Sequence, residues 1–282
     1  MTATRPKRVV LANSLTGFGK VSIQTALPIL AVAQLEVALL PTVLLSSHTA
    51  YPNPYITSFE KGMDAFVEKW EEMEMPIDGV ITGYLRTAQE VQTLQNMALE
   101  LVVDPVMGDG GRLYKGFTVD FIQEEKELCK RAKVILPNVT EARFLLDLNQ
   151  GEEQVAEGEL EEMARALASL GPEEVLITGV PLNEARLGVA YFSKQTQHFQ
   201  IFETPRYPHY FVGTGDLLTA LVGAAHFRGL SLPHALPHFL SFMDQALRTT
   251  IDLGWDGKQG VYYQPHLGQL LEFFKGETDE KE

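Results

Sequence analysis

The sequence predicts an α/β fold in which a mostly parallel sheet is covered by helices on both faces, a three-layer α/β/α sandwich. Short β-rich runs alternate along the chain with longer segments of helical period, and repeated β-then-α units are typical of such sheets. Several of the β-rich runs are apolar at consecutive positions, as expected of parallel strands that are buried on both faces. In these folds ligands bind beyond the carboxyl ends of the strands, which is where functional residues are expected.

The predicted elements alternate along nearly the whole chain. Strands are expected over residues 8–13, 37–45, 79–82, 101–104, 134–136, 175–178 and 188–192. Helices are expected over residues 21–34, 58–72, 87–99, 118–129, 140–146, 152–170, 215–228 and 236–252. Because neither an internal repeat nor a low-complexity linker interrupts this order, we predict a single domain over residues 1–275. The charged segment 276–282 lacks apolar anchors and is expected to be a frayed acidic tail.

Composition excludes several classes of protein. The chain has 282 residues, 45% of them hydrophobic, and a formal net charge of −14 at pH 7, which argues against binding to duplex nucleic acid. The single cysteine, Cys129, excludes an intrachain disulfide and a cysteine-based zinc site and is consistent with a reducing compartment. The first apolar run is too short for a signal peptide, and the longest, residues 31–45, is interrupted by Gln34, Glu36 and Pro41. We therefore expect a cytoplasmic protein with neither a nucleic-acid nor a membrane partner.

The first βα turn, residues 13–21, contains two glycines but matches no phosphate-binding motif. Val21 stands where a Walker A motif requires Ser or Thr, and Ser14 stands where it requires its first Gly. Ser22 replaces the third Gly of a dinucleotide fingerprint. We therefore interpret this turn as one wall of a pocket.

A second glycine-containing motif, Gly213-Thr214-Gly215-Asp216, precedes a helix that is apolar nearly all round and is therefore expected to be buried. The two glycines allow backbone N–H groups to turn toward a bound anion, and the helix dipole adds positive potential there. Asp216 lies in the first turn, where a carboxylate is either a catalytic group or a helix cap. An apolar helix has little structural need for an acid at this position, which favours the catalytic interpretation.

Three further groups of polar residues follow predicted strands. Asp104 precedes a glycine-rich segment, residues 105–114, that is expected to be a mobile, ligand-accommodating loop. Asn138 and Glu141 follow the next strand and are either ligands of a hydrated Mg²⁺ ion or part of a helix cap. His48 follows the second strand and is placed to line a pocket.

Five motifs stand in order along the chain: Ser46-Ser47-His48-Thr49, Thr82-Gly83-Tyr84-Leu85, Asp104-Pro105-Val106-Met107-Gly108-Asp109, Pro137-Asn138-Val139-Thr140-Glu141 and Gly213-Thr214-Gly215-Asp216. Together they resemble the pyridoxal/pyridoxine/pyridoxamine kinases of the ribokinase-like superfamily. The resemblance extends from the first strand to about residue 252. It implies a single domain without a separate lid, a homodimer, and phosphorylation of the 5′-hydroxymethyl group of a B6 vitamer. It also implies ATP and Mg²⁺ as cofactors and leaves open whether a monovalent cation is required.

The resemblance further implies roles for individual residues on the substrate side. Asp216 would take the proton of the hydroxymethyl group, and Gly213, Thr214 and Gly215 would form an anion hole around the transferring phosphoryl group. The pyridine ring would be bound by Ser14, Thr49 and Tyr84, with His48 beside them and Thr16 as an alternative to Ser14.

On the nucleotide side, Asn138 and Glu141 match an Asn-x-x-Glu element that positions Mg²⁺ and phosphates. Asp104 and Glu141 would hold Mg²⁺, partly through water. Thr178 and Gly179 resemble a strand end that contacts the nucleotide, and the segment 108–114, which ends at Tyr114, resembles one that folds over ATP.

Three other functions share some of these features. A hydroxymethylpyrimidine kinase shares several of the motifs but usually has Cys where this chain has Asp216. A non-catalytic vitamer-binding relative is disfavoured because Asp216, Asn138 and Glu141 are all present. A nicotinamide oxidoreductase is disfavoured by the incomplete dinucleotide fingerprint. The preferred vitamer is not determined by the sequence.

Overall fold

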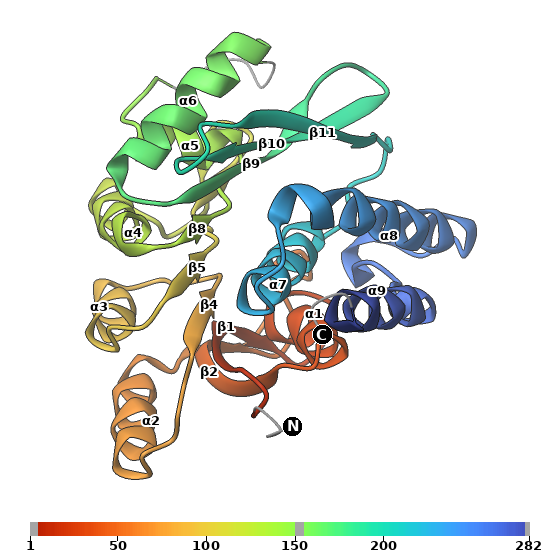
Figure 1. The fold of residues 1–282 in the computed structure, drawn as a ribbon. Helices are drawn as coiled ribbons and strands as arrows, with labels where there is room; N and C mark the ends of the chain where they lie inside the picture. Colours follow the sequence, from red (N-terminus) through yellow and green to blue (C-terminus); the bar gives the residue numbers. More distant parts are fainter. Residues whose placement is uncertain (1–4, 150–154, 280–282) are drawn as a thin grey trace. The chain divides into compact units, whose positions relative to one another are not determined.

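The computed structural model describes residues 5–149 and 155–279. The chain forms two compact units, one combining Met1–Ile81 with Pro208–Glu282 and the other consisting of Thr82–Tyr207. Figure 1 shows the elements of each along the chain. Within the described ranges, no helix has both the length and the apolar character needed to cross a membrane.

The sheet of the first unit has the order β4-β1-β2-β3, with β1 and β2 parallel and β3 antiparallel to β2. β1 is buried over four consecutive apolar residues, 9–12, as a parallel strand covered on both faces requires. The strands are β1 (Arg8–Thr16), β2 (Glu36–Leu45), β3 (Ile56–Ser58) and β4 (Gly79–Thr82).

The helices of the first unit are α1 (Ser22–Val32), α2 (Glu60–Glu72), α7 (Thr214–Phe227), α8 (Leu232–Asp252) and α9 (Leu267–Asp279), with two short 3₁₀ helices, η1 (Gly257–Gln259) and η2 (Gln264–His266). α7 packs against α1 and is buried over most of its length because it is apolar nearly all round (Figure 1). Gly223 allows α7 to approach β4 closely as well: a Cβ there would lie 2.6 Å from Cδ1 of Ile81. The packing holds the first turn of α7 in a defined place.

The sheet of the second unit has the order β11-β10-β9-β8-β5, in which β5, β8 and β9 are parallel and β10 is antiparallel to both of its neighbours. A separate hairpin of β6 and β7 stands beside α5. The strands are β5 (Leu101–Val103), β6 (Gly108–Asp109), β7 (Arg112–Leu113), β8 (Val134–Ile135), β9 (Glu174–Pro181), β10 (Arg186–Ser193) and β11 (Phe199–Pro205). The helices are α3 (Ala88–Asn96), α4 (Val119–Arg131), α5 (Val139–Leu145) and α6 (Glu157–Leu170).

The predicted α/β class with a mostly parallel sheet is confirmed. All seven expected strands and all eight expected helices are present, and β4 has the predicted bounds. The predicted helix over 152–170 is seen from Glu157 onward, since residues 150–154 lie outside the described ranges. The prediction of a single domain stays a prediction.

Two segments that were expected to be irregular contain secondary structure, while the mobility of the first and the fraying of the second stay predictions. The glycine-rich segment after Asp104 is not a simple loop: β6 and β7 form an antiparallel hairpin, because Gly110 and Gly111, with φ of 57° and 75°, supply the two left-handed residues of a tight turn. The expected frayed tail is helical as far as it is described, since α9 continues to Asp279. Residues 280–282 lie outside the described ranges.

Candidate functional site

The first unit places Asp216 in the first turn of α7. Gly213 is the residue before the helix and has φ of 80°, in the left-handed region that favours glycine. A Cβ at this position would lie 2.2 Å from the carbonyl oxygen of Lys20, so only glycine fits. The result is a tight turn, residues 213–215, whose backbone N–H groups belong to the positive end of the helix dipole.

The carboxylate of Asp216 is held by neutral donors from two other elements. Asn13 Nδ2, in β1, donates to its Oδ1 at 3.2 Å. Ser22, the first residue of α1, donates with both its backbone N–H and its hydroxyl. Burial raises the pKa of Asp216, while the bonds from Ser22 and Asn13 lower it, and the net shift is upward. A carboxylate with a raised pKa is a better proton acceptor than an exposed one.

Ser14 is connected to the carboxylate of Asp216 by hydrogen bonds through Ser22. The hydroxyl of Ser14 donates to that of Ser22 at 2.8 Å, and both side chains are buried. Thr16 is also buried and donates to the carbonyl of Gly19 at 3.4 Å. Ser14 is therefore the one of the two that is connected to Asp216.

His48 and Thr49 follow β2 in the same unit. His48 is buried, and its Nε2 lies 2.6 Å from the carbonyl oxygen of Lys258, while its Nδ1 accepts from the N–H of Ala50 at 3.3 Å. Because a carbonyl oxygen only accepts, these partners assign the ring proton to Nε2. Thr49 is exposed.

An aromatic row that sequence reasoning did not predict continues from His48. The ring of Tyr51 lies 4.8 Å from the ring of His48, and the ring of Phe18 lies 5.5 Å from that of Tyr51. Phe18 is 59% exposed. Sequence reasoning also missed Asn13 and the bonding role of Ser22. The signal for Asn13 was available, because it lies at the end of the predicted first strand.

The second unit brings Asn138 and Glu141 together in a capping box at the start of α5. Asn138 Oδ1 accepts from the N–H of Glu141 at 2.9 Å, and Glu141 Oε2 accepts from the N–H of Asn138 at 2.9 Å. Glu141 Oε1 also accepts from the N–H groups of Met107 and Gly108, at 3.1 and 3.4 Å. Asn138 Nδ2 donates to the carbonyl of Gly108 at 2.8 Å. The predicted cap is thus present, and the same residues fix the β6–β7 hairpin.

Asp104 and Glu141 are both buried carboxylates that follow neighbouring strands, β5 and β8. The pKa of Glu141 is raised well above its ordinary value, first by burial and then by the negative charge of Asp104, and these effects outweigh three N–H donors. A divalent cation beside the two carboxylates would remove this repulsion. Mg²⁺ fits them, because it takes one or two carboxylates and completes its six ligands with water and phosphate oxygens. In the described part of the chain, no group of three or more His, Cys, Asp or Glu residues could hold a metal by itself.

Two further carboxylates are buried in the second unit. Glu90 and Glu125 are completely buried, and neither oxygen of Glu125 has a hydrogen-bond partner among the described residues. Burial, followed by the charges of Asp104 and Glu90, raises the pKa of Glu125 well above its ordinary value. Cys129 is buried as well, and its pKa is also raised. A buried thiol with a raised pKa is not a nucleophile.

Thr178 and Gly179, in β9, lie next to Asn138. Thr178 pairs with Asn138 in a parallel bridge, and its N–H donates to the carbonyl of Pro137 at 2.9 Å. Gly179 has φ of 63°, and a Cβ there would meet no atom within 4 Å. β9 continues to Pro181, so Thr178 and Gly179 lie within the strand and not at its end as predicted. Gly179 is exposed there, next to the residue that pairs with Asn138.

The rings of Tyr84 and Tyr114 both lie near the ring of Phe117, a residue that was not predicted from the sequence. The ring of Phe117 lies 5.6 Å from that of Tyr84 and 6.4 Å from that of Tyr114, and Phe121 anchors the group at 5.1 Å from Phe117. Burial raises the pKa of Tyr84. Tyr84 is half-buried and Tyr114 is 39% exposed, so both present ring surface to a ligand.

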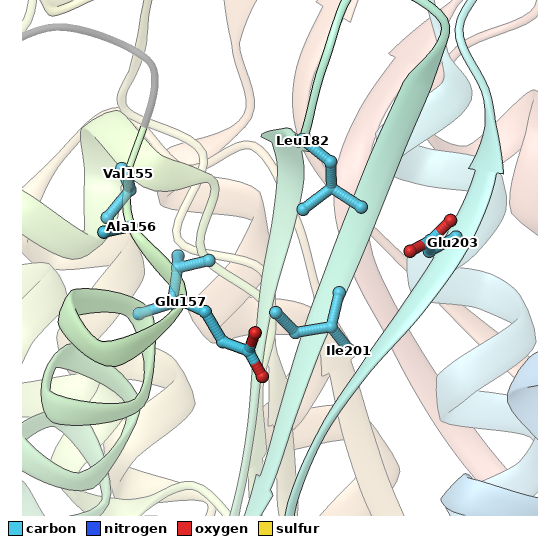
Figure 2. Close-up of a pocket in the computed structure, with 7 residues that line it drawn as sticks. Val155, Ala156, Glu157, Leu182, Ile201 and Glu203 are labelled. Carbon is cyan, nitrogen blue, oxygen red and sulfur yellow. The ribbon is translucent and has the colours of Figure 1, made fainter.

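A cavity of about 470 Å³ in the second unit contains none of the predicted site residues. Figure 2 shows Leu182 and Ile201 between two carboxylates, those of Glu157 and Glu203. The remaining lining residues are Val155, Ala156 and Leu160. The residues predicted to contact the nucleotide therefore lie outside this cavity.

Replacing Glu141 by Gln is expected to lower the free energy of unfolding by about 1–3 kcal/mol, because the amide cannot satisfy the three N–H groups that the carboxylate accepts. Urea unfolding followed by circular dichroism measures the change. Glu71→Gln, on the exposed face of α2, is the control and should change it by less than about 0.5 kcal/mol. Equal losses in the two variants would mean that the capping box adds no stability.

Comparison with known proteins agrees with this arrangement of motifs. A family model described as "Phosphomethylpyrimidine kinase" matches residues 55–261. The pyridoxal kinase of Ovis aries is 30% identical over 93% of this chain and 91% of its own length. The crystal structure of pyridoxal kinase from Lactobacillus plantarum has a TM-score of 0.87 and 30% identity, covering 95% of this chain and 97% of that one. A Bacteroides thetaiotaomicron protein, assigned as a phosphomethylpyrimidine kinase and crystallised with pyridoxal, has a TM-score of 0.90 and 31% identity, covering 94% and 96%.

Proposed function

The chain belongs to the family of ribokinase-like kinases that includes the pyridoxal kinases and that the phosphomethylpyrimidine kinase model describes. From this premise we propose that it transfers the γ-phosphoryl group of ATP to the 5′-hydroxymethyl group of a B6 vitamer: pyridoxal, pyridoxamine or pyridoxine. The observation that carries the proposal is the position of Asp216, a carboxylate with a raised pKa in the first turn of a buried helix, directly after the 213–215 turn.

On the acceptor side, Asp216 takes the proton as the hydroxymethyl oxygen forms its bond to the γ-phosphorus and the bond from that phosphorus to the β–γ bridging oxygen breaks. ADP leaves with the bridging oxygen. Phosphoryl transfer depends mainly on positioning and charge stabilisation, so a carboxylate and an anion hole suffice on this side. The N–H groups of Gly213, Thr214 and Gly215 supply the anion hole at the positive end of α7.

On the donor side, Asn138, Thr178 and Gly179 contact the nucleotide, together with Tyr114 of the β6–β7 segment. Asp104 and Glu141 would hold Mg²⁺, partly through water. When bound, this ion neutralises charge on the phosphate oxygens. The repulsion between the two buried carboxylates supports this assignment, because it disappears when a cation is present.

The residues proposed to bind the vitamer ring are Ser14, Thr49, Tyr84 and His48. Support comes from the bond between Ser14 and Ser22, which connects a ring-binding hydroxyl to a partner of Asp216. The proposal also includes a homodimer in the cytoplasm. Light scattering after size exclusion tests the dimer and should give twice the mass of one chain.

The test is a coupled ADP-release assay with pyridoxal, pyridoxamine, pyridoxine and hydroxymethylpyrimidine as acceptors. We expect kcat/KM to be at least about tenfold higher for the best vitamer than for hydroxymethylpyrimidine, a difference within reach of a few contacts in one pocket. Activity should require Mg²⁺. Parallel reactions in potassium and tetramethylammonium salts decide whether a monovalent cation is needed.

The family model favours one alternative, a hydroxymethylpyrimidine kinase. A higher kcat/KM for hydroxymethylpyrimidine than for every vitamer would replace the proposal with this function. Tight vitamer binding in a calorimeter without ADP release would identify a non-catalytic binder instead.

A further inference from the structure

Lys20, in the first βα turn, has its ammonium group in a cage of aromatic rings. Its Nζ lies 4.5 Å from the ring centroids of both Trp255 and Tyr262 and 5.9 Å from that of Tyr263. Nζ also donates to Oε1 of Gln264 at 2.8 Å. Ammonium groups at these distances from ring faces are attracted by the ring quadrupole, and partial burial strengthens the attraction.

The cage is itself fixed to the first unit. Tyr263 is 1% exposed, and its hydroxyl donates to the carbonyl of Thr25 in α1 at 3.1 Å. The N–H of Tyr262 donates to the hydroxyl of Thr250 in α8 at 2.8 Å. The rings of Trp255 and Tyr262 lie 4.9 Å apart. The cage is therefore an anchor for the lysine side chain.

The backbone of Lys20 contacts the turn that precedes Asp216. A Cβ added to Gly213 would lie 2.2 Å from the carbonyl oxygen of Lys20, and one added to Gly260 would lie 2.7 Å from the same oxygen. The N–H of Lys20 donates to the carbonyl of Gln259 at 3.3 Å. On the other side of the turn, the N–H of Val212 donates to the carbonyl of Gly257 at 3.2 Å. Gly213 is thus enclosed by the backbone of Lys20 and by the segment that carries the cage.

Two residues after Lys20, Ser22 donates its N–H to Asp216. Ser22 has φ of 50°, a left-handed conformation that is uncommon for a residue other than glycine. Such a conformation persists only where the surrounding structure holds it. The anchor on Lys20 lies immediately upstream of this strained residue.

We infer that Lys20 is a positioning residue: its caged ammonium group fixes residues 20–22, and through them the Gly213 turn and the carboxylate of Asp216. The inference rests on the proposed function, because its consequence is measured in the phosphoryl-transfer step. The partners that hold the side chain are uncharged, so the positive charge over the rings, and not an ion pair, provides the anchor.

The test compares Lys20→Met, which keeps the length of the side chain and loses the charge, with Lys20→Arg, which keeps the charge. For Lys20→Met we expect kcat to fall by about 10- to 100-fold, the loss that follows from a displacement of about 1 Å in a reacting group. The Kd of the vitamer, measured by calorimetry, should stay within about threefold, since Lys20 acts on the reacting groups. Lys20→Arg should keep kcat within about threefold of the wild type, because guanidinium also binds ring faces. Lys61→Met, on the exposed side of α2, is the control and should behave as the wild type.

A second measurement does not depend on activity. Hydrogen exchange of the amides of residues 212–216 should accelerate in Lys20→Met and remain as in the wild type in Lys20→Arg and Lys61→Met. If the wild type phosphorylates no acceptor, the proposed function fails, and this exchange measurement still decides whether Lys20 holds the turn.

The inference is overturned if Lys20→Met keeps kcat within twofold with unchanged exchange, or if Lys20→Arg is as impaired as Lys20→Met. Should Lys20→Met not fold, Tyr262→Leu removes one wall of the cage and keeps the backbone bond to Thr250. We expect this variant to lose about 2- to 10-fold in kcat, since one of the rings within cation–π distance is removed. An unchanged kcat in Tyr262→Leu would also refute the role of the cage.

Discussion

Replacing Asp216 by Asn is expected to lower kcat by about 10²–10⁴-fold, the usual contribution of a positioned general base. The amide has nearly the shape of the carboxylate and keeps one acceptor oxygen, so it retains only part of the bonding to Asn13 and Ser22, and it cannot take the proton of the hydroxymethyl group. The Kd values of ATP and of the vitamer should therefore change by no more than about threefold, because ground-state binding is retained.

Steady-state ADP release and calorimetry measure the two effects. The matched control is Asp120→Asn, which removes a carboxylate from the first turn of another helix, α4, where it is exposed. If Asp216→Asn turned over as fast as Asp120→Asn, Asp216 would have no part in the reaction.

The wild-type pH profile provides a related check. A base acts only in its ionised form, so kcat falls as the pH decreases through the pKa of Asp216 in the bound complex. Since burial raises that pKa above its ordinary value of 3.8, the acidic limb should lie above the pH range of an exposed aspartate. The pH profile of the residual kcat of Asp216→Asn should lack this acidic limb.

Replacing Gly213 by Ala is expected to have the second-largest effect. The added Cβ would lie 2.2 Å from the carbonyl oxygen of Lys20, and the residue would have to keep φ of 80°. We expect the free energy of unfolding to fall by about 1–3 kcal/mol from backbone strain. We also expect kcat to fall by about 10²–10³-fold, as on loss of an anion-hole donor, because the turn must move away from its position.

Thermal unfolding and ADP release separate these two effects. Gly268→Ala, in α9, is the control, because a Cβ there would meet no atom within 4 Å. Its kcat should be that of the wild type. A Gly213→Ala protein with wild-type kcat and stability would show that the turn accommodates a side chain and that its geometry is not required.

The sequence predicted the secondary structure well where the local pattern of apolar residues determines it. The prediction was poor where a segment becomes a strand only by pairing with a distant strand. β4 was located to the residue because a short apolar run stands between polar segments. β11 was missed because its residues, 199–205, include polar ones and form a strand by pairing with β10 over a long antiparallel register. The β6–β7 hairpin was missed because each strand has two residues and is held by bonds from Asn138, Thr140 and Glu141. Such contacts between distant segments leave no periodic signal.

In the candidate site too, some residues could be identified from the sequence and others could not. Asp216, Asn138, Glu141 and Asp104 could be identified because each follows a strand or begins a helix, and such ends are recognisable in sequence. Their roles stay predictions. Asn13 and the bonding role of Ser22 were missed because a hydrogen bond across about two hundred residues depends on how β1, α1 and α7 pack.

The order of apolar runs was enough, by itself, to determine the α/β class. The five motifs indicated the family by resemblance and the polar residues at element ends. Only the tertiary structure decided which atoms face one another: the donors of Asp216, the closure of the Gly213 turn by Lys20, and the cage of rings around that lysine. The physical reason is the separation along the chain over which each effect acts. Hydrophobic periodicity and turn preferences act over a few residues, whereas burial, charge and hydrogen bonding act between whatever groups the fold brings within a few ångströms.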